Sequence, residues 1–246
     1  MQAFIPSAGL GTRLRPLTDN CPKALVQVGN RTLLEHAISR VIDAGAHHIV
    51  VNVHHHAQQI IDFLTSHSWE AEIRISDERE QLLDTGGGLR HAAPLFLHDE
   101  PILTYNVDVI SCFDLKDLYR KHLAESNLVT LAVSRRDSSR QLLFDADGKL
   151  TGWHNRQSNS YLWSSQPSGQ VVEMAYSGIA LIDPVLLQLL PQTPPPYPII
   201  PELVRLAQER HIGALVHNCR DWIDVGRHET LQQLEQTYRR HGKFFA

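Results

Sequence analysis

The sequence has few cysteines, no long apolar run and no basic run, and each shortage excludes a class of protein. Its three cysteines, Cys21, Cys112 and Cys219, are too scattered for a disulfide framework or a paired zinc motif. They are typical of a chain that works in a reducing cytoplasm. The apolar runs are too short to span a bilayer, and the first residues lack the pattern of a signal peptide. We therefore expect a soluble, cytoplasmic protein.

The charge balance also limits the partners. The 246 residues include 23 Lys and Arg against 27 Asp and Glu, a formal net charge of -4. Without a basic excess or a Lys/Arg run, nucleic acid and anionic membranes are excluded as partners. A chain of net negative charge that binds a polyanion must gather its cations in one place. Any local basic cluster is therefore informative.

Short apolar runs alternate with helical patterns through the first half of the chain. This alternation predicts an α/β protein with a Rossmann-like three-layer αβα fold and a mostly parallel mixed sheet. The strands are expected at residues 2–6, 48–53, 72–76, 102–105 and 128–134, and the helices at residues 33–44, 57–65, 88–97 and 115–124.

The pattern changes after residue 136. Two apolar runs, 142–144 and 150–154, flank the turn sequence Asp145-Ala146-Asp147-Gly148, which predicts a small β-hairpin insertion. The polar stretch 158–170 is expected to be a loop. Further strands are expected at residues 176–182 and 212–217, and helices at residues 183–190, 200–209 and 229–240. No repeat or long linker divides the chain, so residues 1–246 should form one domain.

A glycine-rich loop follows the first expected strand. The segment from Ser7 to Thr18 contains Gly9 and Gly11, followed by Arg13 and Arg15, and Lys23 lies a little further along. Small residues let the backbone N–H groups approach a phosphate, and guanidinium groups match phosphate geometry. The Rossmann fingerprint fails because Leu14 replaces its third glycine, and no Gly-Lys-Ser/Thr of a Walker A loop follows.

Two aspartates are candidate metal ligands. Asp108 follows the apolar run at residues 102–105, and the ends of parallel strands are where α/β sheets bind ligands. Asp224 lies just before Gly226. Mg²⁺ prefers carboxylate and phosphate oxygens, so two aspartates from distant segments suit one ion that bridges two substrates.

Four motifs together resemble the sugar-1-phosphate nucleotidyltransferase family, the nucleotide-sugar pyrophosphorylases. The string GLGTRLRPLT followed by PKAL is similar to its N-terminal phosphate loop. Residues 81–89 (QLLDTGGGL) resemble its second glycine motif, Asn106-Val107-Asp108 its metal motif, and residues 222–226 (WIDVG) its C-terminal metal motif. The motifs occur in the family's order and span nearly the whole chain. The resemblance implies a GT-A-like nucleotidyltransferase fold.

The resemblance also implies roles for particular residues. Residues 1–136 would form the nucleotide-binding half, 137–228 the sugar-binding half and 229–246 a C-terminal helix. Arg13, Lys23 and Asp108 would be catalytic, and Mg²⁺ would bind Asp108 and Asp224. The nucleotide would contact Ala8, Gly9, Gly11, Thr12, Arg13, Asp84, Thr85, Gly86, Gly87 and Asn106, and the sugar phosphate would contact Glu173, Ser177, Gly178 and Asp224.

The sequence departs from the family pattern at two places. Val107 occupies a position where the family usually has glycine, and a side chain there is expected to crowd the sugar or shift the backbone. The Glu-Lys-Pro segment that grips the sugar phosphate in many members is absent. Arg156 and Lys149 are the candidates that replace its lysine, and the sequence does not decide between them.

The short length and the motif pair resemble the small single-domain members. These include N-acetylmuramate 1-phosphate uridylyltransferases of cell-wall recycling and mannose- or heptose-1-phosphate guanylyltransferases. The resemblance favours an enzyme that uses UTP, N-acetylmuramate 1-phosphate and Mg²⁺. The GTP-dependent reaction is the alternative, and a non-catalytic module that binds nucleotide sugars, favoured by Val107, is the second. The sequence leaves open whether the protein forms a homodimer.

Overall fold

A computed structural model describes residues 1–166, 169–193 and 195–245, and its main feature is a ten-stranded sheet. In its larger part, β12 is the one strand that opposes the others, so this part is mostly parallel as expected. The strands there follow the spatial order β5 (Glu72–Asp77), β4 (His48–Val53), β1 (Gln2–Pro6), β6 (Ile102–Tyr105), β12 (Val172–Ile182), β8 (Val129–Ser134) and β13 (Ile212–Val216).

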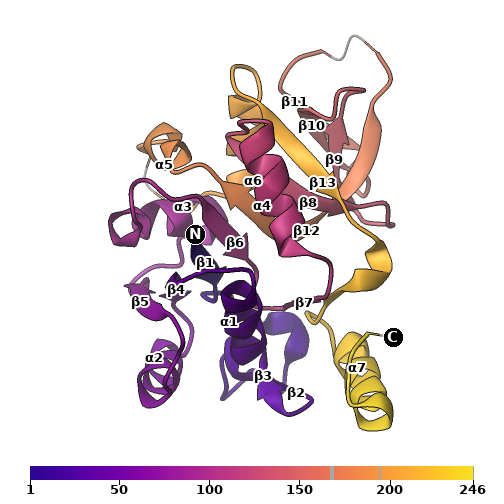
Figure 1. Cartoon of the computed structure of the whole chain (residues 1–246). Coiled ribbons are helices and arrows are strands. Elements are labelled where there is room, and N and C mark those ends of the chain that lie inside the picture. The colour runs from indigo at the N-terminus through magenta and orange to yellow at the C-terminus, as the bar shows by residue number, and fades with distance from the viewer. Residues whose placement is uncertain (167–168, 194, 246) are drawn as a thin grey trace.

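Helices cover both faces of this sheet, which makes the expected three-layer αβα fold (Figure 1). Side chains alternate along β1, so Ala3 and Ile5 enter one core and Phe4 the other. The first core also takes in apolar residues of α1 (Leu33–Asp43), α2 (Ala57–Ser66), α4 (Leu115–Ala124) and α7 (His228–His241). The second takes in residues of α3 (Asp84–His91), α5 (Val185–Leu189) and α6 (Ile199–Leu206).

The expected β-hairpin is present and is larger than predicted. Strands β9 (Arg140–Phe144) and β10 (Leu150–Asn155) flank the predicted turn, where Gly148 has φ +77°. The first half of β12 pairs with β9, so the long strand β12 joins the hairpin to the central sheet. The hairpin side of the sheet stands at the upper right of Figure 1.

The expected loop at 158–170 was wrong in part. Its residues Ser160–Trp163 form β11, an edge strand that pairs with β10. All four residues of this strand are exposed, so no apolar alternation marks it in the sequence. The ring of Tyr161 stacks on His154 of β10 with 4.0 Å between centroids. Residues 167–168 of the expected loop lie outside the described part of the chain.

The helix expected at 88–97 begins earlier and ends earlier, at Asp84–His91. Its three glycines read as helix breakers, yet each lies where a neighbour leaves no room for a side chain. A Cβ on Gly86 would lie 2.6 Å from the ring of Tyr197, and one on Gly87 would lie 2.8 Å from Pro195. The glycines therefore serve close packing inside a helix, which propensity alone does not predict.

The sequence also missed four short strands, which occur as two ladders of two or three residues per strand. One ladder pairs β2 (Gln27–Val28) with β3 (Arg31–Thr32), and the other pairs β7 (Val109–Ser111) with β14 (Trp222–Asp224). Strands of this length are too short to show a periodic pattern. Short 3₁₀ helices occupy Thr12–Leu14, Lys23–Leu25, Ala93–Leu95 and Cys219–Asp221.

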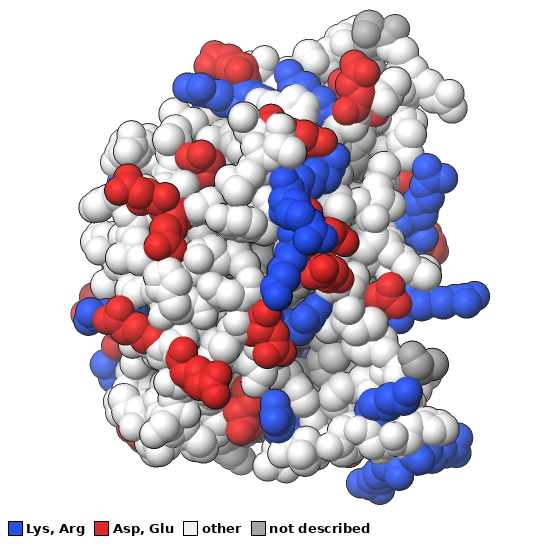
Figure 2. Space-filling view, in the orientation of Figure 1, with Lys and Arg blue, Asp and Glu red and all other residues white. Residues whose placement is uncertain are grey.

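Acidic and basic side chains are interspersed on the face drawn in Figure 2. The basic side chains of α4 belong to this pattern, because Arg120 pairs with Asp117 and Lys121 with Glu125 on the same helix. Such pairs make a solvated surface and no anion site. Among the described residues, none of the helices combines the length and the apolar character that a membrane crossing requires.

Candidate active site

Three adjoining cavities run along one edge of the sheet. The loop cavity, of about 640 Å³, is lined by Ala8, Gly9, Lys23, Asn106 and Asp108 among others. The arginine cavity, of about 1120 Å³, is lined by residues that include Arg13, Arg136, Arg140, Asp224 and Arg227. Between them lies a mainly apolar cavity of about 540 Å³, which shares Asp84, Thr85 and Asn106 with the first and Arg140, Trp153 and Tyr176 with the second. The shared walls make one continuous cleft.

The predicted phosphate loop, residues 7–18, follows β1 and is held by hydrogen bonds to the protein. The backbone N–H of Ser7 donates to Asn52 Oδ1 at 2.6 Å. Gly11 has φ +63°, and its carbonyl accepts from Thr18 Oγ1 at 2.8 Å. A Cβ at Gly11 would lie 2.9 Å from Thr18, so only glycine fits both the conformation and the space. The loop therefore has a fixed shape, with Gly9 exposed at the cleft.

The two candidate metal carboxylates are neighbours across the β7–β14 ladder. Asp224 lies opposite Val109, and the backbone N–H of Val225 donates to the carbonyl of Asp108 at 2.8 Å. Asp108 faces the loop cavity and Asp224 the arginine cavity. The two residues are more than a hundred positions apart in the sequence, and this ladder joins them where the cavities meet.

One of the two predicted catalytic cations pairs with Asp108, and the other lies near Asp224. Lys23 Nζ makes an ion pair with Asp108 Oδ2. Asp224 Oδ1 accepts from the backbone N–H of Gly226 at 2.6 Å. A Cβ at Gly226 would lie 2.5 Å from Arg13 Nη2 and 2.6 Å from Asp224 Oδ1, so the guanidinium lies against this glycine beside the carboxylate. The structure thus brings Arg13, Lys23, Asp108 and Asp224 to one place.

The side chain of Val107 points into the protein core. Its side chain is 5% exposed and packs in the core that β1 and α1 share, while residue 107 itself borders the loop cavity. The backbone of the turn is held at both ends, by Asn106 N–H to the carbonyl of Gly178 at 2.9 Å and by the Val225 bond to Asp108. The valine therefore fills core space beneath the two polar residues.

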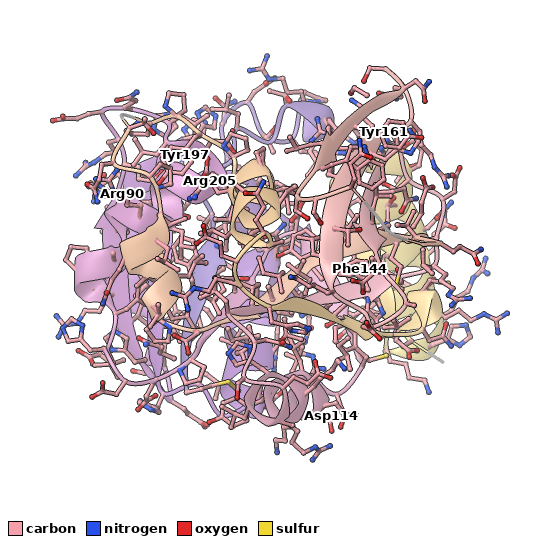
Figure 3. All side chains as sticks on the ribbon, turned by 90° about the horizontal axis from the view of Figure 1, so that it is seen from above. Arg90, Asp114, Phe144, Tyr161, Tyr197 and Arg205 are labelled. Atoms are coloured by element: carbon pink, nitrogen blue, oxygen red, sulfur yellow. The ribbon has the colours of Figure 1, made fainter. Side chains whose placement is uncertain are left out.

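The second glycine motif forms the first turns of α3. The N–H groups of Gly86 and Gly87 donate to the carbonyl of Tyr197 at 3.0 and 3.2 Å, so a protein partner already occupies them. Figure 3 shows Tyr197 near Arg90, which is also on α3. Asp84 and Thr85 are exposed and line the loop and apolar cavities. Of this motif, these two are the predicted ligands that face the cleft.

A buried polar chain supports both glycine motifs, and the sequence did not reveal it. Asn52 Nδ2 donates to Glu78 Oε1 at 2.8 Å, and the same amide holds the phosphate loop at Ser7. Glu78 is 4% exposed, and its Oε2 has no hydrogen-bond partner among the described residues. A Cβ at Gly88 would lie 2.8 Å from Glu78 Oε1. Burial raises the pKa of the Glu78 carboxyl, and the Asn52 hydrogen bond opposes this.

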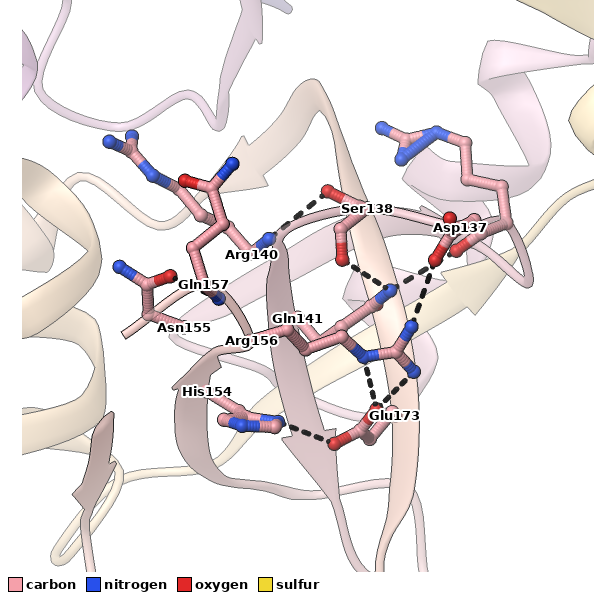
Figure 4. A network of polar contacts seen from close by, with 10 residues as sticks. Asp137, Ser138, Arg140, Gln141, His154, Asn155, Arg156, Gln157 and Glu173 are labelled. Carbon is pink, nitrogen blue, oxygen red and sulfur yellow. Dashed lines mark hydrogen bonds and ion pairs between the residues drawn. The ribbon is translucent and has the colours of Figure 1, made fainter. Parts of the chain in front are cut away.

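Three of the four predicted sugar-phosphate ligands make contacts with the protein instead. Ser177 is buried and its hydroxyl bonds to His217 Nε2 at 2.8 Å. Gly178 has φ +71° and packs under Asn106. Glu173 accepts from His154 at 2.8 Å and pairs with Arg156, as Figure 4 shows. Their roles as ligands stay predictions, and Asp224 is the member of this group that lines the cleft.

The suggested replacements for the missing lysine lie elsewhere. Arg156 is engaged by Glu173 and Asp137, and Lys149 belongs to the hairpin turn, where its N–H donates to Asp145 Oδ1 at 2.9 Å. Neither residue is among those that line the arginine cavity. Besides Arg13, three arginines that no sequence motif indicated line this cavity: Arg136, Arg140 and Arg227.

Arg136 is the best placed of these missed arginines. Its guanidinium lies 4.2 Å from the ring centre of Trp222, and Nη2 donates to the carbonyl of Tyr176 at 2.6 Å. Burial lowers its pKa, and the negative charge of Asp224 acts in the opposite direction. Arginine stays charged in proteins despite such shifts. One feature of the sequence could have indicated Arg136: in a chain of net negative charge, the Arg135-Arg136 doublet directly follows a buried strand.

This fold and this cleft define a nucleotidyltransferase: a phosphate loop, adjacent carboxylates and an arginine-lined cavity lie at the edge of an α/β sheet. The model of the nucleotidyl transferase family matches residues 2–142, and the chain belongs to this family. The N-acetylmuramate alpha-1-phosphate uridylyltransferase of Caulobacter vibrioides is 30% identical over 234 residues, 91% of each chain. The protein is a sugar-1-phosphate nucleotidyltransferase.

Two further similarities agree with this assignment. The mannose-1-phosphate guanyltransferase of Pichia angusta is 28% identical over 235 residues, which cover 92% of this chain and 61% of that protein. A solved structure of a UDP-glucose pyrophosphorylase from Acinetobacter baumanii has a TM-score of 0.79 at 17% identity, covering 99% of this chain and 95% of that chain. This last similarity supports the fold alone.

Replacing Glu78 by glutamine should make stability less sensitive to pH. The raised pKa means that the folded carboxyl keeps its proton at a pH where the unfolded one, near 4.5, has released it. The unfolded state then binds fewer protons at this residue, so the contribution of Glu78 to the free energy of unfolding falls as pH rises above about 4.5. Glutamine keeps the acceptor for Asn52 and has no such titration. Denaturant unfolding from pH 4.5 to 8 should show the variant gaining on the wild type.

Glu80→Gln is the matched control, because Glu80 is exposed two residues away. Its stability difference from the wild type should stay flat over the same pH range. Equal pH slopes for the Glu78 and Glu80 variants would contradict the assignment of the raised pKa to Glu78.

Proposed function

We propose that the protein transfers a uridylyl group from UTP to N-acetylmuramate 1-phosphate and releases pyrophosphate. The observation that carries the transferase reaction is that Asp108 and Asp224, on backbone segments that pair with each other, face the loop cavity and the arginine cavity of one cleft. The choice of UTP and muramate rests on the Caulobacter vibrioides relative, which matches over 91% of both chains.

GTP with mannose 1-phosphate is the second candidate. Several mannose-1-phosphate guanyltransferases match at 27–34% identity. The chain spans 61% of the length of the one from Pichia angusta, at 28% identity. The Caulobacter vibrioides relative, at 30% identity over 234 residues, favours the muramate reaction.

The reaction needs no general base. The sugar phosphate is already an anion at neutral pH, and its oxygen attacks the α-phosphorus while the bond to pyrophosphate breaks. The contribution of the protein is therefore position and charge. In this proposal the loop from Ala8 to Thr12 binds the triphosphate through its backbone, Arg13 stabilises the charge that develops on the departing pyrophosphate, and Lys23 holds the phosphate next to Asp108.

The donor set near the cleft fits Mg²⁺. Asp108 and Asp224 present oxygen ligands from adjacent segments, and the Asp108 carboxylate already contacts a cation, the ammonium of Lys23. No group of three or more His, Cys, Asp or Glu within the described ranges forms a metal cluster, which suits an ion that takes its other ligands from phosphate and water. Mg²⁺ on these two aspartates would neutralise and align the phosphates of both substrates.

The same proposal divides the chain by function. The loop cavity, built mostly by residues before 136, would take the nucleotide, and the arginine cavity, built mostly by residues from 136 onward, would take the sugar phosphate. Three free cysteines, two of them exposed, support a reducing compartment such as the cytoplasm.

A pyrophosphate-release assay tests the proposal. UTP, GTP, dTTP, CTP and ATP are each combined with the 1-phosphates of N-acetylmuramate, N-acetylglucosamine, mannose and heptose in the presence of Mg²⁺. The highest kcat/KM is expected for UTP with N-acetylmuramate 1-phosphate. A higher value for GTP with mannose or heptose 1-phosphate would replace the proposal by the second candidate.

Asp108→Asn should lower kcat at least about 100-fold with the fold intact, because the amide no longer supplies a charged oxygen for the ion. The Asp108 side chain is 17% exposed, and the backbone bond to Val225, which holds the turn, does not involve it. The control is Asp99→Asn on the exposed surface before β6, which should keep wild-type rates. Near wild-type turnover and an unchanged Mg²⁺ requirement in the Asp108 variant would exclude the metal role.

Arg13→Ala should lower kcat about 100- to 1000-fold, the cost of removing one preorganised charge-stabilising group. The exposed side chain contributes little to folding, so thermal unfolding should change little. Steady-state kinetics that separate kcat from KM provide the measurement. A rise in KM with kcat unchanged would make Arg13 a binding residue and exclude it from transition-state stabilisation.

A further inference from the structure

Four arginines line the arginine cavity: Arg13, Arg136, Arg140 and Arg227. Arg13 lies against Gly226 beside Asp224, and Arg136 stacks on Trp222 within the field of the same carboxylate. Both guanidinium groups therefore serve the end of the cavity where phosphates would meet. Arg140 lies apart from them, at the start of β9 on the hairpin.

The guanidinium of Arg140 has no internal role. It makes neither a hydrogen bond nor an ion pair within the described part of the chain, where only its backbone N–H has a side-chain partner, Ser138 Oγ at 3.3 Å. The nearby acids are already engaged, because Arg156 pairs with both Asp137 and Glu173. Figure 4 shows the Arg140 side chain directed away from that cluster, beside Gln157, which also lines the arginine cavity.

Arg140 also occupies the boundary between two environments. Together with Trp153, Tyr176 and Ile200 it lines both the arginine cavity and the apolar cavity. Among the lining residues of the apolar cavity it is the only Lys or Arg, and the other charged one is Asp84, on the nucleotide side. An anion that reaches this boundary meets the exposed guanidinium of Arg140, which has no side-chain partner among the described residues, beside apolar walls, and the bond it forms there is charge-assisted.

We propose that Arg140 binds a second anionic group, a carboxylate, carried by the sugar 1-phosphate, and that it thereby selects acidic sugars. This inference deepens the proposed function and rests on it. The planar fork of a guanidinium matches a carboxylate in a bidentate pair. The carboxylate end of the sugar would point toward the hairpin, while the 1-phosphate would remain near Arg136 and Asp224.

The test compares two substrates that differ by one lactyl ether, the group that carries the carboxylate. N-acetylmuramate 1-phosphate is N-acetylglucosamine 1-phosphate with this ether, so the ratio of their kcat/KM values with one nucleotide reports how well the lactyl group is recognised. Arg140→Gln should lower kcat/KM for the muramate substrate about 10- to 100-fold, the range for a hydrogen-bonded charge pair. It should leave the glucosamine substrate within about twofold. Arg140→Lys, which keeps the charge and loses the fork, should fall between.

Arg210→Gln is the control, since Arg210 is exposed and lines none of the three cavities. It should change neither substrate. Equal losses on both substrates in Arg140→Gln would make Arg140 a phosphate-binding residue and overturn the proposal. No loss on either substrate would also overturn it.

A second substrate pair separates this inference from the proposed function. Glucuronate 1-phosphate and glucose 1-phosphate also differ by a carboxylate, and calorimetric Kd values for both pairs do not require turnover. If muramate fails as a substrate but the wild type prefers the glucuronate member and Arg140→Gln loses that preference, the proposed function falls and the inference stands. If the wild type prefers the acidic member of neither pair, the inference is wrong.

Discussion

The site depends on one backbone contact, the ladder between β7 and β14. Its bond from Val225 N–H to the Asp108 carbonyl joins the turn after β6 to a strand near the end of the chain. Two carboxylates from distant segments thereby become neighbours, and the cavities they face become one cleft. Backbone hydrogen bonds hold this geometry without using the side chains, which stay available for chemistry.

Each of the two aspartates has a cation close by. Lys23 pairs with Asp108, Arg13 lies beside Asp224, and Arg136 adds its charge to Asp224 while resting on Trp222. The same cations suit polyanionic substrates. A chain with a net charge of -4 thus places several cations at the cleft, while Arg120 and Lys121 on α4 pair with acids of their own helix.

Sequence periodicity predicted the long elements well, because β1, β4, β6 and β8 are continuous buried runs between turn signals. It failed at α3, where glycines serve close packing against Tyr197, and at β11, whose exposed residues show no alternation. In these places a partner distant in the sequence decides the local structure, and no local pattern reports it.

The sequence by itself determined the family of the protein and pointed to the glycine-rich loop, Asp108 and Asp224 as candidates, because motifs of adjacent residues carry their own geometry and charge. Only the tertiary structure decided which other side chains face the cleft. Ser177 bonds to His217, and Glu173 pairs with Arg156. Arg136 and Arg140 line the cavity although no sequence motif predicted it. The direction of a side chain is set by its neighbours across the sheet and in the core, and these are brought together only when the chain folds.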